Sequence, residues 1–221
     1  MPGFRERLRD LPMFPDGLPD GQISDPDAVP PTPHDLFTAW FDDAVAAGAY
    51  APHAMTLSTA GGGAVVDART VLLTDLDAGG WWFAGHATSP KGRHLAENPH
   101  AALTFLWREI GRQVRVTGTV SSHPDVGVED FRRRSDVSRA TGLVDHQSEV
   151  LDDLAEHREA WAEALQEVRA DPRRVPSTWT AWRLSPFSVE FWQTGAGTGQ
   201  TRLRYRRGTG PTAWTTELLW P

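Results

Sequence analysis

The sequence predicts a mainly β protein of the α+β class, in which an antiparallel barrel is decorated by three or four helices. Between Ala54 and Val120, short β-rich runs follow one another and are separated by turns at Gly61–Gly63 and Asp77–Gly80. After a helical middle part, the C-terminal part returns to strand-like runs. Strand follows strand without the crossover helices that a parallel doubly wound sheet requires, which favours antiparallel pairing.

The predicted strands are short runs rich in β-branched and aromatic residues. We expect five or six of them before residue 121 and the others near the C-terminus. They are AMTLST (54–59), AVV (64–66), RTVLLT (69–74), GWWFAG (80–85), AALTFLW (101–107), QVRVTGTV (113–120), TWTAWRLS (178–185), SVEFWQ (188–193), RLRYRR (202–207) and TAWTTELLW (212–220).

The predicted helices have recognisable starts, stripes or ends. Apolar residues from Leu36 to Val45 recur at three- and four-residue spacing and stop at Gly48, which predicts an amphipathic helix with a glycine end. Ser89 followed by Pro90 is the chemistry of a helix start. A further helical stretch follows Pro124, and a longer one is expected from Ser148 to Ala170.

The first 33 residues are rich in Pro, Asp and Gly and show no sustained periodicity. This pattern predicts a flexible N-terminal arm at 1–33 that lies over the body or over a partner subunit. Residues 34–221 are long enough for one sizeable core, and we expect them to form a single domain.

The composition excludes several classes of function. With 22 Lys and Arg against 29 Asp and Glu, the net charge is −7, whereas nucleic-acid binding depends on clustered basic residues. The chain has no cysteine, which excludes disulfides, thiolate metal ligands and cysteine nucleophiles. No apolar stretch has the length of a signal peptide or a membrane span, so we expect a soluble cytoplasmic protein without a membrane partner.

Polar residues set in strand-like segments and at a helix start together indicate a site for flavin mononucleotide (FMN). A phosphorylated isoalloxazine needs cations at one end and flat apolar surface with amide donors at the other. Lys91 falls in the first turn of the helix after Ser89, where free N–H groups and the helix dipole favour an anion. The candidates are Arg69, Lys91, Gln113, Gln147, Ser148, Trp192 and Arg202.

Five of these candidates also have an ordinary alternative. Lys91 could be a solvated lysine beside a helix cap, and Arg69 an edge-strand charge. Trp192, one of ten tryptophans, could be a barrel-core aromatic, and Arg202 part of a solvated charged face. Ser148 could cap the long helix, and both roles could hold at once.

The order of several motifs resembles the pyridoxine/pyridoxamine 5′-phosphate oxidase family over nearly all of residues 34–221. The motifs are MTLST, the strand with Arg69, SxKGRxLxENP, GRQVRVxGxV, HQSE, VEFWQ, RLRYRR and a terminal LxP. The resemblance implies an FMN-binding split β-barrel that forms a homodimer, with two FMN molecules at the subunit interface.

The resemblance also assigns residues to the flavin. We expect His86, Thr88 or Ser89 to help bind the flavin where family residues are missing. The resemblance implies that Arg69 and Lys91 hold the phosphate and that a strand offers backbone groups to the ring. That strand comprises Thr70, Val71, Leu72, Leu73 and Thr74. From the other subunit it implies Gln113, Gln147, Ser148, Trp192 and Arg202.

The substrate side departs from the family pattern. Thr74 replaces a lysine, Asp130 replaces a tyrosine, and Thr198–Gly199–Gln200 replaces Arg-Leu-His. Of the expected substrate contacts Arg134 and Ser138 remain, and Gln200 is a further candidate. Losing a cation and gaining an anion disfavours a phosphate dianion, because charge–charge interactions at about 4 Å reach roughly a few kcal/mol. Asp130 and Arg134, four residues apart on one helix, could simply pair with each other.

Two further departures concern the flavin. Pro90 stands where the family has arginine, and Ala84–Gly85 where it has Tyr-Thr. The segment GHATSPKGRHL (85–95) is similar to that of the phenazine-biosynthesis flavin oxidases, a branch of the same family, although that branch keeps the Arg-Leu-His triplet.

The resemblance therefore implies an FMN-dependent oxidase, which transfers a hydride from a small substrate to the flavin and is reoxidised by dioxygen. We expect a substrate other than pyridoxamine phosphate, such as a secondary-metabolite intermediate. A genuine pyridoxine/pyridoxamine 5′-phosphate oxidase and a non-catalytic flavin-binding protein remain alternatives. The histidines are scattered without metal-ligand spacing, so no metal is expected, and no catalytic base is identified.

Overall fold

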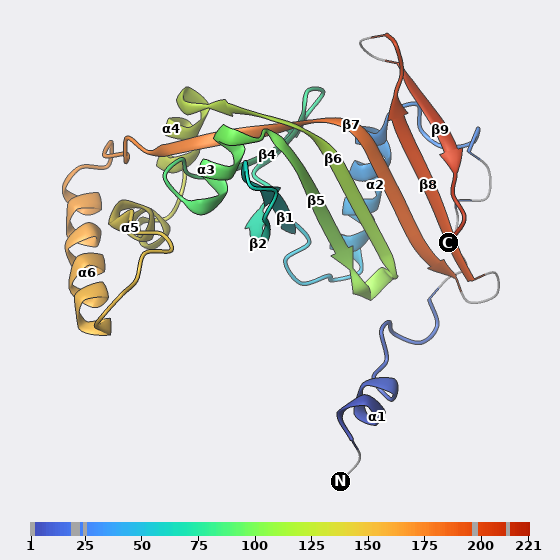
Figure 1. Ribbon diagram of the computed structural model, residues 1–221, viewed down its shortest axis with the longest axis horizontal. Coiled ribbons are helices and arrows are strands. Elements are labelled where there is room, and N and C mark those ends of the chain that lie inside the picture. The colour runs from blue at the N-terminus through green and yellow to red at the C-terminus, as the bar shows by residue number, and fades with distance from the viewer. Residues whose placement is uncertain (1–2, 19–22, 24–25, 196–198, 211–212) are drawn as a thin grey trace. The chain divides into compact units, whose positions relative to one another are not determined.

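A computed structural model describes residues 3–18, 23, 26–195, 199–210 and 213–221 of the chain (Figure 1). Its α-helices are α1 (Phe4–Arg9), α2 (Pro33–Ala46), α3 (Pro90–Glu97), α4 (Pro124–Arg132), α5 (Asp136–Val144) and α6 (Leu154–Ala170). Its strands are β1 (Ala54–Ala60), β2 (Val66–Leu72), β3 (Asp75–Asp77), β4 (Gly80–His86), β5 (His100–Trp107), β6 (Arg112–His123), β7 (Trp179–Gly195), β8 (Gly199–Arg207) and β9 (Trp214–Leu218). A 3₁₀ turn, η1 (Arg108–Ile110), joins β5 to β6.

The strands form one sheet in the order β2-β1-β5-β6-β7-β4-β3, and β8 and β9 extend it from β7. The pairs β3–β4, β4–β7, β7–β8 and β8–β9 are antiparallel. These pairings confirm the predicted antiparallel α+β class. In the register of β7 with β8, Trp192 stands opposite Arg202, so two predicted flavin residues are cross-strand neighbours.

The chain divides into two compact units. The first unit comprises Met1–Ala54, Leu103–Val116 and Phe187–Pro221. Its aromatic core forms where α2 packs on strands: the Phe37 ring lies 4.9 Å from that of Phe105, and the Trp40 ring lies 5.1 Å from that of Phe191. Edge-to-face packing of this kind favours a defined core geometry.

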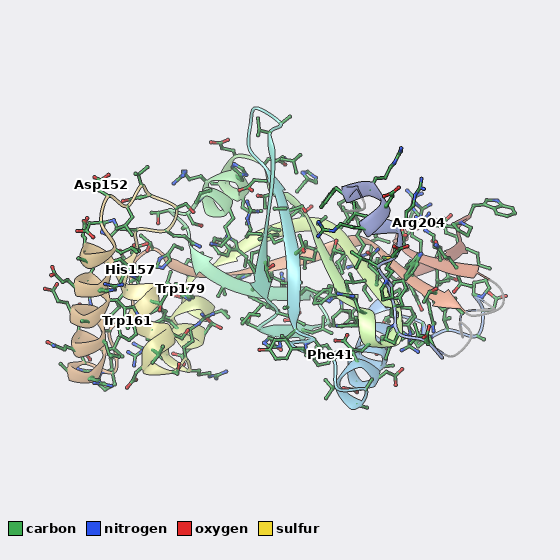
Figure 2. The ribbon with its side chains drawn as sticks, turned by 90° about the horizontal axis from the view of Figure 1, so that it is seen from below. Phe41, Asp152, His157, Trp161, Trp179 and Arg204 are labelled. Carbon is green, nitrogen blue, oxygen red and sulfur yellow. The ribbon has the colours of Figure 1, made fainter. Side chains whose placement is uncertain are left out.

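The second unit comprises Met55–Ala102 and Thr117–Pro186. Phe83 of β4 stacks on Trp182 of β7 at 5.5 Å. The helices α5 and α6 pack side by side around Ala140, Ala164 and Val168, and the Trp161 Nε1–H of α6 donates to Thr141 Oγ1 of α5 (Figure 2).

Several boundaries differ from the sequence prediction. The described residues contain six α-helices rather than three or four, because a short α1 forms within the predicted arm and two helices, α4 and α5, follow Pro124. The long helix begins at Leu154, not at Ser148, because the Asp153 side chain accepts the Ala155 N–H and caps it. The runs at 178–185 and 188–193 belong to one continuous strand, β7.

The described part of the chain contains no helix that is long and apolar enough to cross a membrane. The division into an arm at 1–33 and one domain at 34–221 remains a prediction.

Candidate functional site

The first feature of the site is the turn that starts α3. Ser89 is the N-cap: its Oγ accepts the Gly92 N–H at 3.3 Å and donates to the His86 carbonyl at 2.6 Å. Pro90 occupies the first helical position, as the sequence predicted. The capped first turn brings the next side chain, Lys91, back over Ser89.

Lys91 is the only lysine in the chain, and it is only 5% exposed. Its Nζ donates to Ser89 Oγ at 3.0 Å and to Gln147 Oε1 at 2.9 Å, and both acceptors are neutral. Burial, and secondarily the charge of Arg69, lower the pKa of Lys91 to about 8. Gly85 leaves room for this side chain, because a Cβ there would lie 3.0 Å from Lys91 Cε.

Arg69 on β2 is the second cation. Its Nη1 donates to Thr59 Oγ1 at 2.7 Å and to the Leu57 carbonyl at 3.2 Å, while Nη2 pairs with Asp67 at 2.5 Å. The Arg69 guanidinium holds the pKa of Asp67 below its ordinary value. Because Arg69 also lowers the pKa of Lys91, the two cations repel each other, and an anion bound by both would relieve that repulsion.

Gln147 reaches Lys91 from the segment after α5. Gln147 accepts a hydrogen bond from Lys91 of its own chain. Its contact with a flavin from the neighbouring subunit stays a prediction. Ser148 is exposed and has a positive φ of 71°. It does not cap α6, and no role for it follows from its contacts.

A buried histidine and a carboxylate lie beside this cluster and were not predicted as a pair. His86 Nδ1 lies 2.7 Å from Asp145 Oδ1 and 2.9 Å from Thr178 Oγ1. Burial lowers the pKa of His86, although the Asp145 charge opposes that shift. No local pattern predicts this pair, because His86 and Asp145 are far apart in the chain and only folding brings them together.

The strand expected to face the flavin ring is β2 with the residues that follow it. β2 is the first strand in the sheet order, so one of its edges faces away from β1. The Thr74 N–H donates to the Trp82 carbonyl at 2.9 Å and is therefore engaged within the sheet. Thr70, Leu72 and Thr74 are exposed, and Val71 and Leu73 are half-buried.

The remaining flavin candidates belong to the first unit. The Trp192 Nε1–H donates to Gln200 Oε1 at 3.0 Å, and its ring lies 5.6 Å from that of Phe14. Trp192 is half-buried rather than a fully buried core residue, and Gln113 on β6 is half-buried as well. Thr198 lies outside the described residues.

Arg202 is held by a buried carboxylate. Its Nε donates to Glu190 Oε1 at 2.9 Å, and its Nη1 donates to the Trp220 carbonyl at 2.9 Å. Glu190, which is 6% exposed, also pairs with Arg115 at 2.5 Å. Glu190 thus fixes the direction of Arg202 and compensates part of the positive charge.

We expect Glu190→Gln to destabilise the protein, because the carboxylate charge shared by Arg115 and Arg202 is lost and glutamine offers one acceptor oxygen in place of two. Each hydrogen bond to a charged group is worth about 1.5–3 kcal/mol. The urea midpoint of unfolding measures the loss. Glu217→Gln is the matched control: Glu217 pairs with Arg204, and its side chain is 42% exposed, so the midpoint should move much less. Equal midpoints for both variants would contradict the role given to Glu190.

The structure confirms the predicted pairing at the candidate substrate contacts. Arg134 Nε donates to Asp130 Oδ2 at 3.0 Å, and the guanidinium lies 4.6 Å from the centre of the Trp179 ring. Ser138 lies in the first turn of α5, where its N–H donates to Ser135 Oγ. The charge of Arg134 is therefore already matched by a carboxylate.

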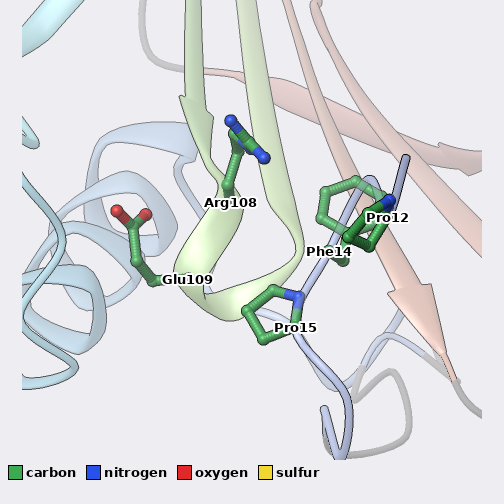
Figure 3. Close-up of a pocket in the computed structure, with 5 residues that line it drawn as sticks. All are labelled: Pro12, Phe14, Pro15, Arg108 and Glu109. Atoms are coloured by element: carbon green, nitrogen blue, oxygen red, sulfur yellow. The ribbon is translucent and has the colours of Figure 1, made fainter. Parts of the chain in front are cut away.

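A separate hollow of about 300 Å³ lies in the first unit, lined by Pro12, Phe14, Pro15, Arg108 and Glu109 (Figure 3). Arg108 Nε donates to the Met13 carbonyl at 3.4 Å, so the N-terminal segment lies on the turn between β5 and β6. None of the predicted site residues lines this hollow. Across the described ranges, no group of three or more His, Asp or Glu side chains could hold a metal ion.

Sequence comparisons identify relatives over most of the chain. A family profile described as "Pyridoxamine 5'-phosphate oxidase" matches residues 41–178, and one described as "Pyridoxine 5'-phosphate oxidase C-terminal dimerisation region" matches residues 179–221. A pyridoxine/pyridoxamine 5′-phosphate oxidase of Salinibacter ruber is 40% identical over 203 residues, which cover 88% of this chain and 92% of the relative. One of Rhodopseudomonas palustris is 35% identical over 214 residues, covering 94% and 96%.

Structure comparisons agree on the fold. PhzG from Burkholderia lata, solved in complex with tetrahydrophenazine-1-carboxylic acid, matches with a TM-score of 0.85 at 30% identity, covering 93% of this chain and 100% of that chain. A pyridoxamine 5′-phosphate oxidase-related, FMN-binding protein from Nostoc punctiforme matches with a TM-score of 0.71 at 16% identity, covering 87% and 100%. These neighbours confirm the predicted split-barrel fold.

Proposed function

Because the chain belongs to the pyridoxamine 5′-phosphate oxidase family, we propose that it is an FMN-dependent oxidase acting on a small reduced substrate that carries no phosphate. The observation that carries the proposal is the buried ammonium of Lys91, which has two neutral oxygen partners and a second cation, Arg69, nearby. Burying such a charge without an anionic partner is costly, so the cluster favours an anionic ligand.

The donors in this cluster fit a phosphate monoester. Lys91 supplies a point charge, Arg69 supplies a planar guanidinium, and both lie in the same unit as the capped start of α3. Gly85 keeps the space that the lysine side chain needs. These residues would bind the phosphate of FMN and so orient its ring.

In a homodimer, residues from the first unit of the partner subunit would complete the site around the flavin ring. The match of residues 179–221 to a dimerisation region supports that assembly. Trp192 offers a flat apolar surface, and Arg202, fixed by Glu190, would stabilise negative charge on the reduced ring. FMN, when bound, would supply the hydride acceptor, and its reoxidation by dioxygen would consume two electrons and two protons and give hydrogen peroxide.

The surroundings of the Arg134 guanidinium indicate the class of substrate. Arg134 is paired with Asp130 and stacked on Trp179, and the Asp130 carboxylate would repel a phosphate dianion bound at Arg134. A flat, non-phosphorylated N-heterocycle suits the same surroundings. The structural likeness to PhzG, whose solved complex holds a tetrahydrophenazine carboxylic acid, supports this class.

A second candidate function is oxidation of pyridoxamine 5′-phosphate itself. It is supported by the 40% identity to the Salinibacter ruber oxidase. The two candidates differ in the role of the substrate phosphate, and that difference can be measured directly.

The test compares pyridoxamine 5′-phosphate with pyridoxamine, which differs from it by the phosphate alone. We expect the two kcat/KM values to agree within about tenfold, because Asp130 already compensates Arg134 and a partly exposed ion pair contributes little net binding. Tetrahydrophenazine-1-carboxylic acid should bleach the oxidised-flavin absorbance without oxygen and, with oxygen, yield one hydrogen peroxide for every two electrons removed. A preference for the phosphorylated amine above about 1000-fold would establish the second candidate instead.

A further inference from the structure

The segment from Asp145 to Ser148 has an unusual backbone. Asp145 has a φ of 48° and Ser148 a φ of 71°, so a non-glycine residue in the left-handed region stands at each end of it. Such conformations persist only where the surroundings determine them, and they often mark functional positions. Between the two residues lies Gln147, whose Oε1 accepts a hydrogen bond from the Lys91 ammonium group.

The position of Asp145 at the end of its helix is electrostatically unfavourable for a carboxylate. It is the C-cap of α5, where the helix dipole disfavours a negative charge, and its conformation is one that glycine adopts most readily. Helix termination alone therefore does not account for an aspartate here. Other contacts must hold the carboxylate.

Three side chains hold it. His86 Nδ1 lies 2.7 Å from Oδ1, Thr178 Oγ1 donates to Oδ2 at 2.6 Å, and Thr88 Oγ1 donates to Oδ1 at 3.3 Å. His86 is 5% exposed and packs edge-to-face on Trp179 at 4.8 Å. The His86 carbonyl in turn accepts from Ser89 Oγ, the other oxygen that contacts Lys91.

We propose that Asp145 is a positioning residue: fixed by His86 and Thr178, it holds the 145–148 segment so that the side-chain oxygen of Gln147 accepts a hydrogen bond from Lys91. The identity of the anion bound there, the phosphate of FMN, rests on the proposed function. The positioning role concerns the chain's own residues and can be tested without flavin.

The test is a double-mutant cycle between Asp145→Asn and Gln147→Ala. Asparagine tolerates the left-handed conformation and keeps the shape and an acceptor oxygen, so the backbone should persist. Because Lys91 is the only lysine, protein labelled with ¹³C at lysine Cε gives a single lysine side-chain signal, and its titration reports this amine alone.

In flavin-free protein, we expect either substitution to lower the pKa of Lys91, because the Gln147 oxygen favours the ammonium form. The double variant should titrate like Gln147→Ala alone. A direct charge effect of Asp145 on Lys91 would persist without Gln147, and additive shifts would therefore overturn the proposal. Asp136→Asn, an exposed aspartate in the first turn of α5, is the matched control and should leave the titration unchanged.

The same cycle is then measured with FMN. Each single substitution should weaken FMN binding by about tenfold, and the double variant by about tenfold rather than 100-fold. If the wild-type protein binds no FMN, the proposed function fails, while the lysine titration still decides whether Asp145 acts through Gln147.

Discussion

Replacing Lys91 by methionine is expected to raise the dissociation constant for FMN by about 10- to 150-fold, which corresponds to a charge-assisted contact worth about 1.5–3 kcal/mol. The flavin-free variant should at the same time be more stable than the wild type. Methionine nearly matches the length of the lysine side chain, and it removes a buried charge whose acceptors, Ser89 and Gln147, are neutral. Binding and stability therefore change in opposite directions.

Two measurements check this result: fluorescence titration with FMN, and thermal unfolding of the flavin-free protein. Arg132→Met is the matched control, because Arg132 is an exposed cation of the same unit that pairs with Glu129 on the same helix. It should change neither quantity. A Lys91→Met protein that is less stable and binds FMN as tightly as the wild type would show that Lys91 supports the fold and not the ligand.

Local chemistry made the start of α3 predictable. Ser89 and Pro90 specify a cap and a first turn from adjacent positions, so the placement of Lys91 followed from the sequence. The start of α6 was not predictable in the same way. Ser148 and Asp153 are both good caps, and the choice depends on the left-handed turn at Ser148, which is a tertiary feature.

The continuity of the strand at Pro186 could not be predicted from the local sequence either. A proline between two apolar runs indicates a break, yet β7 continues through it from Trp179 to Gly195. Next to Pro186, β6 approaches β7 closely: a Cβ on Gly118 would lie 2.3 Å from the Ser185 carbonyl oxygen. Contacts between strands, which no local pattern encodes, decide whether such a strand continues.

Some residues of the candidate site could be predicted from the sequence and others could not. Arg69, Lys91 and Arg202 were identified from motifs, because cations in a recognisable order carry the resemblance. The residues that hold them were not identified. Glu190 compensates Arg202 across the sheet, and Asp145 pairs with His86 beside Lys91, and only the folded chain brings these carboxylates to their partners. Asp67 pairs with Arg69 from two residues away on β2.

The affinity for FMN is expected to depend steeply on pH above about 8. In the flavin-free protein the pKa of Lys91 is lowered from 10.5 to about 8, so the amine loses its proton above that pH. A bound phosphate dianion favours the ammonium and returns the pKa toward its ordinary value, so binding must take up a proton in this range. Full affinity is therefore present below pH 8 and is lost as the pH rises.

The dissociation constant should increase by up to tenfold per pH unit well above pH 8, or about 15-fold between pH 8 and 9.5. Equilibrium titrations with FMN measure the profile. Tyr205 does not titrate in this window, because burial raises its pKa far above the ordinary value. Lys91→Met should bind weakly with a flat profile, and riboflavin, which lacks the phosphate, should bind the wild type without this dependence. A flat wild-type profile would mean that Lys91 keeps its proton whether or not the phosphate is bound, and that no cation of lowered pKa contacts the ligand.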